Sequence, residues 1–135
     1  MVRIERWQDL NSALLRFRTR GLKAAVFQKH CEGDEVKFYA VKAGRLFWPY
    51  YPKESEGYPF HERALKRLAE HAAETLDLEI YGGDAIISPE GKITLIDFND
   101  WPSFAPCRGT AANAIAKFLK DAYRAVKNSR EIAKV

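Results

Sequence analysis

The stretch that decides the fold is LEIYGGDAIISPEGKITLIDFN, residues 78–99. Two apolar runs flank Ser88-Pro89-Glu90-Gly91, a sequence typical of a tight turn. The stretch therefore predicts a β-hairpin. Polar residues inside the two runs need an explanation, because Asp and Asn are depleted in strand interiors.

Helices and shorter strands surround this hairpin in the predicted order. Helical spacing of apolar residues predicts helices in segments 9–21, 60–76 and 109–127, the last with Ala112, Ile115, Ala116, Leu119, Tyr123 and Val126 facing inward. The remaining pattern predicts a short buried strand at 23–28, a turn at 31–35, a hairpin at 35–51 turning at Ala43-Gly44, and a surface loop at 52–59. We expect an α+β fold, an antiparallel sheet with helices packed on it, in one domain spanning 1–135.

Composition narrows the class of protein without naming a function. The 135 residues are 47% hydrophobic and 30% charged, which fits one globular domain and argues against disorder. The two cysteines form no disulfide framework, and no segment predicts a signal peptide or a membrane span, so we expect a cytoplasmic protein without a membrane partner. The net charge of +4 suits a phosphate-bearing ligand, but it also suits an ordinary cytosolic surface, which is the favoured interpretation of the charge by itself.

Three polar residues of the 78–99 hairpin are predicted to share one face. With the turn at 88–91, Asp84 lies roughly opposite the region of Asp97, and residues two apart on a strand, such as Asp97 and Asn99, project together. Carboxylate and amide oxygens with open positions for water and phosphate are what Mg²⁺ requires. The alternative is structural: Asp84 caps a bulge, while Asn99 and Asp100 begin a turn before Pro102.

A second unusual stretch is AVFQKHCEGDEVKFY, residues 25–39. A strand that exits into Gln28, Lys29 and His30 offers free backbone groups that can read an adenine edge, beside a lysine suited to phosphate. Glu35 can accept the two hydroxyls of a ribose. An ordinary hairpin with a solvated polar turn explains the same pattern, and Cys31 has no evident base partner.

Together the two stretches resemble the C-terminal part of an ATP-grasp domain. VFQKHCEGDEVKFYAV, residues 26–41, is similar to the family's hinge strand, turn and following strand. YGGDAIISPEGKITLIDFNDWPSF, residues 81–104, is similar to its closing hairpin, with a Gly-x-Asp strand and an Asp-x-Asn motif before a Pro turn. The match covers about residues 20–125 and is nearest to the carboxylate–amine ligase and inositol-phosphate kinase branches.

The resemblance implies a role for each matching residue. Asp84, Asp97 and Asn99 would hold one or two Mg²⁺ ions against the phosphates of ATP. Other residues would contact the nucleotide or the substrate. These are Gln28, Lys29 and the main chain near His30 and Cys31 at the adenine, Glu35 at the ribose, Lys37 at phosphate or substrate, and Ser103 and Arg108 at the substrate.

The activity implied is an ATP-dependent ligase reaction. A carboxylate is activated as an acyl-phosphate and an amine, or a thiol, then attacks it, while the protein stabilises the transferring phosphoryl group. A complete ATP-grasp enzyme also has a preceding subdomain with a lysine and a Gly-rich loop that cover the phosphates. We expect that half to be absent from this chain and to come from a second chain or from another copy.

Two alternatives belong to other functional classes. The first is a non-catalytic ATP-grasp remnant that acts as a binding or oligomerisation module. The second is a small nucleic-acid binder, supported only by the basic runs at 16–23 and 116–130. These runs fit the solvated faces of two helices equally well, and no nucleic-acid recognition motif is found in the sequence.

Overall fold

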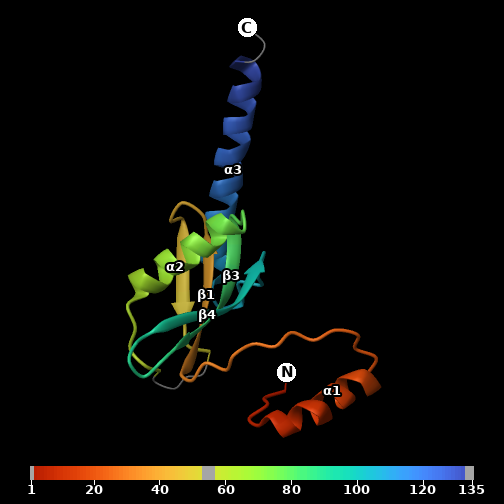
Figure 1. The fold of residues 1–135 in the computed structure, drawn as a ribbon. Coiled ribbons are helices and arrows are strands. Elements are labelled where there is room, and N and C mark those ends of the chain that lie inside the picture. Colours follow the sequence, from red (N-terminus) through yellow and green to blue (C-terminus); the bar gives the residue numbers. More distant parts are fainter. Residues whose placement is uncertain (1, 53–56, 133–135) are drawn as a thin grey trace. The chain divides into compact units, whose positions relative to one another are not determined.

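The chain forms two compact units, residues 1–31 and 32–135, in a computed structural model that describes residues 2–52 and 57–132 (Figure 1). Unit 1 contains a 3-10 helix, η1 (Trp7–Asp9), and the helix α1 (Leu10–Thr19), followed by irregular chain to residue 31. The helix predicted in segment 9–21 is therefore confirmed. Gly21, at a φ of 75°, follows its last turn.

The buried strand predicted at 23–28 is wrong. Residues 22–31 contain no strand, and Val26 is 95% exposed. A strand needs a hydrogen-bonded neighbour, and the structure assigns residues 22–31 to no strand pair. The local β pattern of KAAVFQ is therefore not enough to form a strand here.

Unit 2 is built on a four-stranded antiparallel sheet of order β2-β1-β3-β4. Its strands are β1 (Asp34–Val41), β2 (Leu46–Tyr50), β3 (Ile80–Ile87) and β4 (Ile93–Asp100). Both predicted hairpins are confirmed, and Ala43 and Gly44 take the positive φ angles that a tight turn requires. The loop predicted at 52–59 includes residues 53–56, which lie outside the described residues.

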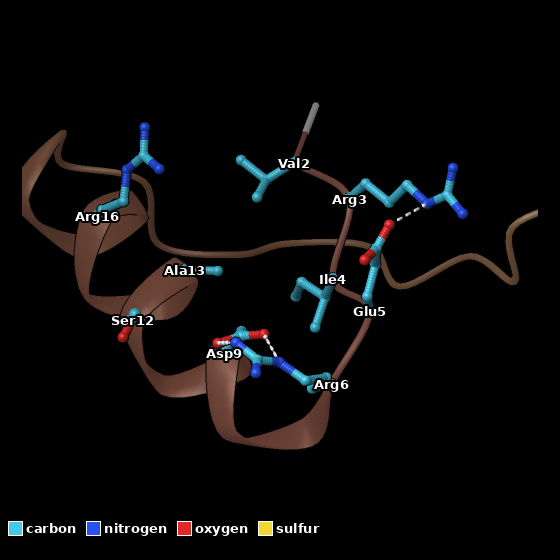
Figure 2. Close-up of a pocket in the computed structure, with 9 residues that line it drawn as sticks. All are labelled: Val2, Arg3, Ile4, Glu5, Arg6, Asp9, Ser12, Ala13 and Arg16. Atoms are coloured by element: carbon cyan, nitrogen blue, oxygen red, sulfur yellow. Dashed lines mark hydrogen bonds and ion pairs between the residues drawn. The ribbon is translucent and has the colours of Figure 1, made fainter.

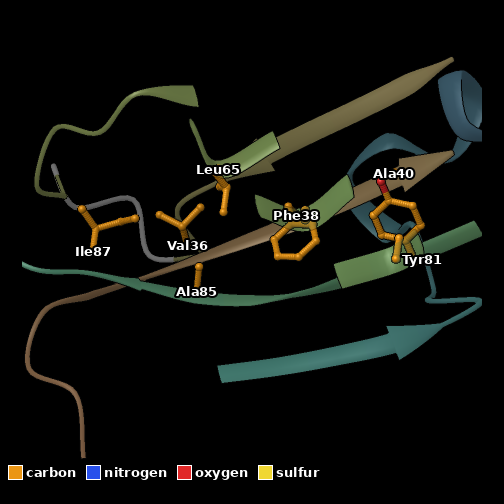
Figure 3. Packing of buried hydrophobic residues seen from close by; sticks show 9 residues of the cluster. Val36, Phe38, Ala40, Leu65, Tyr81, Ala85 and Ile87 are labelled. Carbon is orange, nitrogen blue, oxygen red and sulfur yellow. The ribbon is translucent and has the colours of Figure 1, made fainter. Parts of the chain in front are cut away.

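The helix α2 (Glu62–Thr75) covers one face of the sheet. Figure 3 shows Leu65 of this helix above Val36 and Phe38 of β1. Phe38 and Leu65 are fully buried. Burying each such side chain stabilises the fold by about 1.5–3 kcal/mol, so this cluster is the main core of unit 2.

One half of the opposite face is covered by a 3-10 helix, η2 (Ala105–Cys107), and by the helix α3 (Arg108–Ile132). Ala111 and Ala114 of α3 pack with Val41, Leu46 and Ile80 from the sheet. Figure 1 shows α3 continuing beyond the end of the sheet. Among the residues described, no helix is long and apolar enough to cross a bilayer.

The helix predicted at 109–127 is confirmed, but its predicted inward face is wrong. Leu119, Tyr123 and Val126 are 51%, 70% and 53% exposed. Of the residues on the predicted face, Ile115 packs against the cluster that contains Val41 and Ile80. Phe118, which is not on that face, packs there as well. The small residues Ala111 and Ala114 face the sheet instead, because they allow the helix to approach it closely.

A one-residue bulge divides β4 into two registers. Leu95 lies opposite Ala85, but Asp97 lies opposite Asp84, so Ile96 is the extra residue. Side chains alternate between the two faces of a strand, and one extra residue therefore reverses the faces of everything beyond it. As a result Phe98 joins Leu95 on the α2 side, while Asp97 is directed to the opposite face.

Gly83 lies where β3 and β4 pack closely beside this bulge. A Cβ atom there would lie 2.3 Å from the backbone oxygen of Asp97 and 2.9 Å from Cζ of Phe38. Gly83→Ala should lower the free energy of unfolding by roughly 1–3 kcal/mol, measured by denaturant titration.

Gly109→Ala is the matched control, because a Cβ there meets nothing within 4 Å. It should be neutral or stabilise α3 by up to about 1 kcal/mol. A Gly83→Ala variant as stable as the control would contradict this packing.

Candidate functional site

The half of the sheet face that α3 leaves uncovered carries a band of polar side chains from three strands. We call this band the open face. Register places Lys37 opposite Asp84 and Asp84 opposite Asp97. The members of the open face are Glu35 and Lys37 on β1, Asp84 on β3, and Asp97 and Asn99 on β4.

Lys37 of β1 forms ion pairs with Asp84 of β3 and with Glu35 of its own strand. Its Nζ donates to both carboxylate oxygens of Asp84, at 2.9 and 2.8 Å, and lies 2.9 Å from Oε1 of Glu35. Partial burial lowers the pKa of Lys37, but hydrogen bonds to Asp84 and Glu35 and the charges of these carboxylates outweigh it. The pKa therefore lies well above its ordinary value, and Lys37 remains a cation.

Asp97 and Asn99 form a second, more exposed pair. Nδ2 of Asn99 donates to Oδ2 of Asp97 over 2.7 Å. This bond directs the amide nitrogen toward Asp97. Asp100 lies opposite Tyr81, a residue of the α2-side core, and therefore belongs to the other face.

The contacts of Asp84 connect it to β1. Its carboxylate accepts two hydrogen bonds from the side chain of Lys37. The bulge itself lies in β4, opposite the Asp84–Ala85 step. Asp84 is therefore held as a member of the open face.

Tyrosines border the open face on the side of β2. Tyr50 lies opposite Lys37, and its hydroxyl is 3.3 Å from that of Tyr39. The Tyr39 ring also packs against Phe104, with 5.2 Å between centroids. Burial of the phenol, helped by the Tyr39 hydrogen bond, raises the pKa of Tyr50 to about 12. Tyr50 is not among the residues predicted from the sequence to lie at the site, although its position in the predicted 35–51 hairpin is consistent with this place.

The donor set on the open face fits Mg²⁺ as that ion is usually bound. Asp84 and Asp97 supply two carboxylates directly opposite each other, and Asn99 adds an amide. In the described part of the chain, no group of three or more His, Cys, Asp or Glu side chains could hold a metal. Mg²⁺ does not need such a cage, because it keeps several waters and often binds through one or two carboxylates plus phosphate.

The other predicted residues belong to other segments of the chain. Gln28, Lys29, His30 and Cys31 belong to the irregular segment of unit 1, and Sγ of Cys31 lies 3.9 Å from the Lys29 carbonyl oxygen. Ser103 lies in the loop after β4, and Arg108 is the exposed first residue of α3. The structure thus brings together Glu35, Lys37, Asp84, Asp97 and Asn99.

Unit 1 has a separate cavity of about 510 Å³ at its N-terminal end. Figure 2 shows Arg3 and Arg6 at its wall, each paired with an acidic neighbour, Glu5 and Asp9. Arg16 also lines the cavity. These arginines are exposed and two of them are already paired, so the cavity presents no evident catalytic chemistry.

Comparison of the chain with models of protein families, with curated proteins and with solved structures gave no match.

Proposed function

We propose that the open face binds Mg²⁺ and the phosphates of ATP, as one half of an ATP-grasp-type nucleotide cleft. The observation that carries this proposal is the direct opposition of Asp84 and Asp97, with Asn99 next on the same face. Oxygen donors on paired strands leave the outer side of an ion free for phosphate and water.

The surroundings of these donors support the same proposal. Lys37 and Glu35 lie beside Asp84 within one network, at positions to which the ATP-grasp resemblance assigns phosphate and ribose contacts. The antiparallel sheet covered by α2 on its other face supplies a rigid support. Such a site would favour the transferring phosphoryl group through charge and position.

We further propose that the reaction is ATP-dependent ligation of a carboxylate to an amine or a thiol. The carboxylate oxygen attacks the γ-phosphorus and ADP leaves. The amine or thiol then attacks the acyl carbon, phosphate leaves, and the proton of the amine or thiol is released to solvent. Lys37 and Arg108 are the proposed catalytic cations. The adenine contacts assigned to Gln28–Cys31 remain predictions, as does a second chain or copy that supplies the other half of the cleft.

Asp97→Asn should weaken binding of Mg-ATP at least about tenfold in isothermal titration at millimolar nucleotide, because it removes one of two carboxylates. Asp100→Asn makes the same chemical change in the same strand but on the α2 side, so it should bind like the wild type. Both variants should unfold at the wild-type temperature. Absence of Mg-ATP binding by the wild type, or equal loss in both variants, would contradict the proposal.

A second candidate function is oligomerisation through α3. Exposed apolar residues recur on this helix at spacings of four and three, as in a coiled-coil seam. The seam consists of Ala112, Ala116, Leu119, Tyr123 and Val126. Burying such a stripe against another copy would remove apolar surface from water.

Leu119→Glu places a charge in this seam, and Asn128→Glu places the same charge on an exposed polar position of the same helix. If α3 oligomerises, sedimentation should show a concentration-dependent oligomer for the wild type and for Asn128→Glu, and a monomer for Leu119→Glu. A wild-type chain that stays monomeric at all accessible concentrations would rule this candidate out.

A further inference from the structure

The ammonium of Lys37 is already hydrogen-bonded to the carboxylate of Asp84, which a metal ion on the open face would need as a ligand. Both oxygens of Asp84 accept hydrogen bonds from Nζ, at 2.8 and 2.9 Å. The third nearby oxygen belongs to Glu35, at 2.9 Å. An ammonium has three donors, so these three oxygens use its full hydrogen-bonding capacity.

The charges of the open face determine the electrostatic effect of the contact between Lys37 and Asp84. Glu35, Asp84 and Asp97 contribute three negative charges, and Lys37 is the cation that contacts Asp84 and Glu35. Lys37 therefore offsets part of the repulsion within the carboxylate band. A divalent cation approaching Asp84 meets a resident positive charge, which opposes its binding.

The position of Lys37 also limits where its ammonium can go. Lys37 lies in the middle of β1 and directly opposite Asp84 in the register, and its side chain is 32% exposed. The backbone is fixed by strands on both sides, but the four-carbon stem can rotate. The ammonium can therefore leave Asp84 for an anion placed on the open face without any change in the sheet.

Resting on the proposed function, we propose that Lys37 is an exchangeable counter-ion of the site. It neutralises Asp84 while the open face carries no metal, and it releases Asp84 and pairs with phosphate oxygens when Mg-nucleotide binds. The chain is thereby selective for a metal that arrives with a polyphosphate, because a free ion displaces Lys37 without giving it a new partner. This role differs from that of a strut that only holds the Asp84 side chain in place.

The two roles predict opposite changes in the affinity of Lys37→Met for Mn²⁺ alone. If Lys37 competes with the metal, the variant should bind Mn²⁺ alone roughly tenfold more tightly than the wild type, and Mg-ATP roughly tenfold more weakly. The affinity for Mn²⁺ follows from the concentration of free Mn²⁺, measured by electron paramagnetic resonance. Isothermal titration measures the affinity for Mg-ATP. A strut would instead predict weaker binding of both, because Asp84 would lose its support.

Lys42→Met is the matched control. Lys42 follows β1 and lies 3.7 Å from Glu79, so the variant removes the same charge outside the open face. It should leave both affinities within about twofold of the wild type. Lys37→Gln, which keeps a polar end, repeats the test should Lys37→Met fold poorly.

Failure of this inference and failure of the proposed function are distinguishable. If the wild type binds Mg-ATP but neither Lys37 variant binds Mn²⁺ more tightly, the exchange is wrong and the site stands. If Lys42→Met tightens Mn²⁺ binding as much as Lys37→Met does, the effect is one of net charge and the exchange is again wrong. If the wild type binds no Mg-ATP, the proposed function and the exchange both fall.

Discussion

The one-residue bulge in β4 determines which side chains of the hairpin face the core and which face the proposed cation site. Without the extra residue, continuation of the Ala85–Leu95 register would direct Asp97 and Asn99 toward Phe38 and α2, and Phe98 toward the polar band. Burying a carboxylate in that core would be strongly unfavourable. With the extra residue, Phe98 packs against Phe38, at 5.8 Å between ring centroids, and Asp97 lies opposite Asp84. The main core and the open face therefore depend on the same irregularity.

The loop after β4 decides how much of that face remains open. Pro102 packs against Gly82, where a Cβ atom would lie 2.9 Å from the proline ring. Trp101 and Phe104 adopt positive φ angles, which costs on the order of 1 kcal/mol each, and buried contacts of Phe104 hold that backbone. This path brings η2 and α3 over the half of the face that carries Val41 and Ile80. The half with Lys37 and Asp84 stays uncovered, next to the tyrosines of β1 and β2.

Most of unit 2 was predictable from sequence, because its hairpins and helices have strong local patterns. The turn at 88–91 sets the pairing of β3 with β4, so counting along the strands predicts that Asp84 lies near the region of Asp97. The direct opposition of Asp84 and Asp97 depends on the bulge, because the unbroken register would pair Asp84 with Ile96. The sequence signal of the bulge is the adjacent apolar pair Leu95-Ile96, which breaks the alternation of inward and outward side chains along the strand. The predictions of a strand at 23–28 and of the inward face of α3 are wrong for another reason. Each depends on which neighbours the tertiary structure offers, and local periodicity does not carry that information.

The central claim is that the bulge creates a cation site between Asp84 and Asp97. Line broadening of backbone amides by Mn²⁺, observed by nuclear magnetic resonance, tests it most directly, because a paramagnetic ion broadens the amides nearest to it. The account predicts that the amides of Asp84, Asp97 and Asn99 broaden first, before those of Asp100 and the acidic residues of α2. Broadening centred on α2 or on unit 1, or equal broadening across the chain, would contradict it.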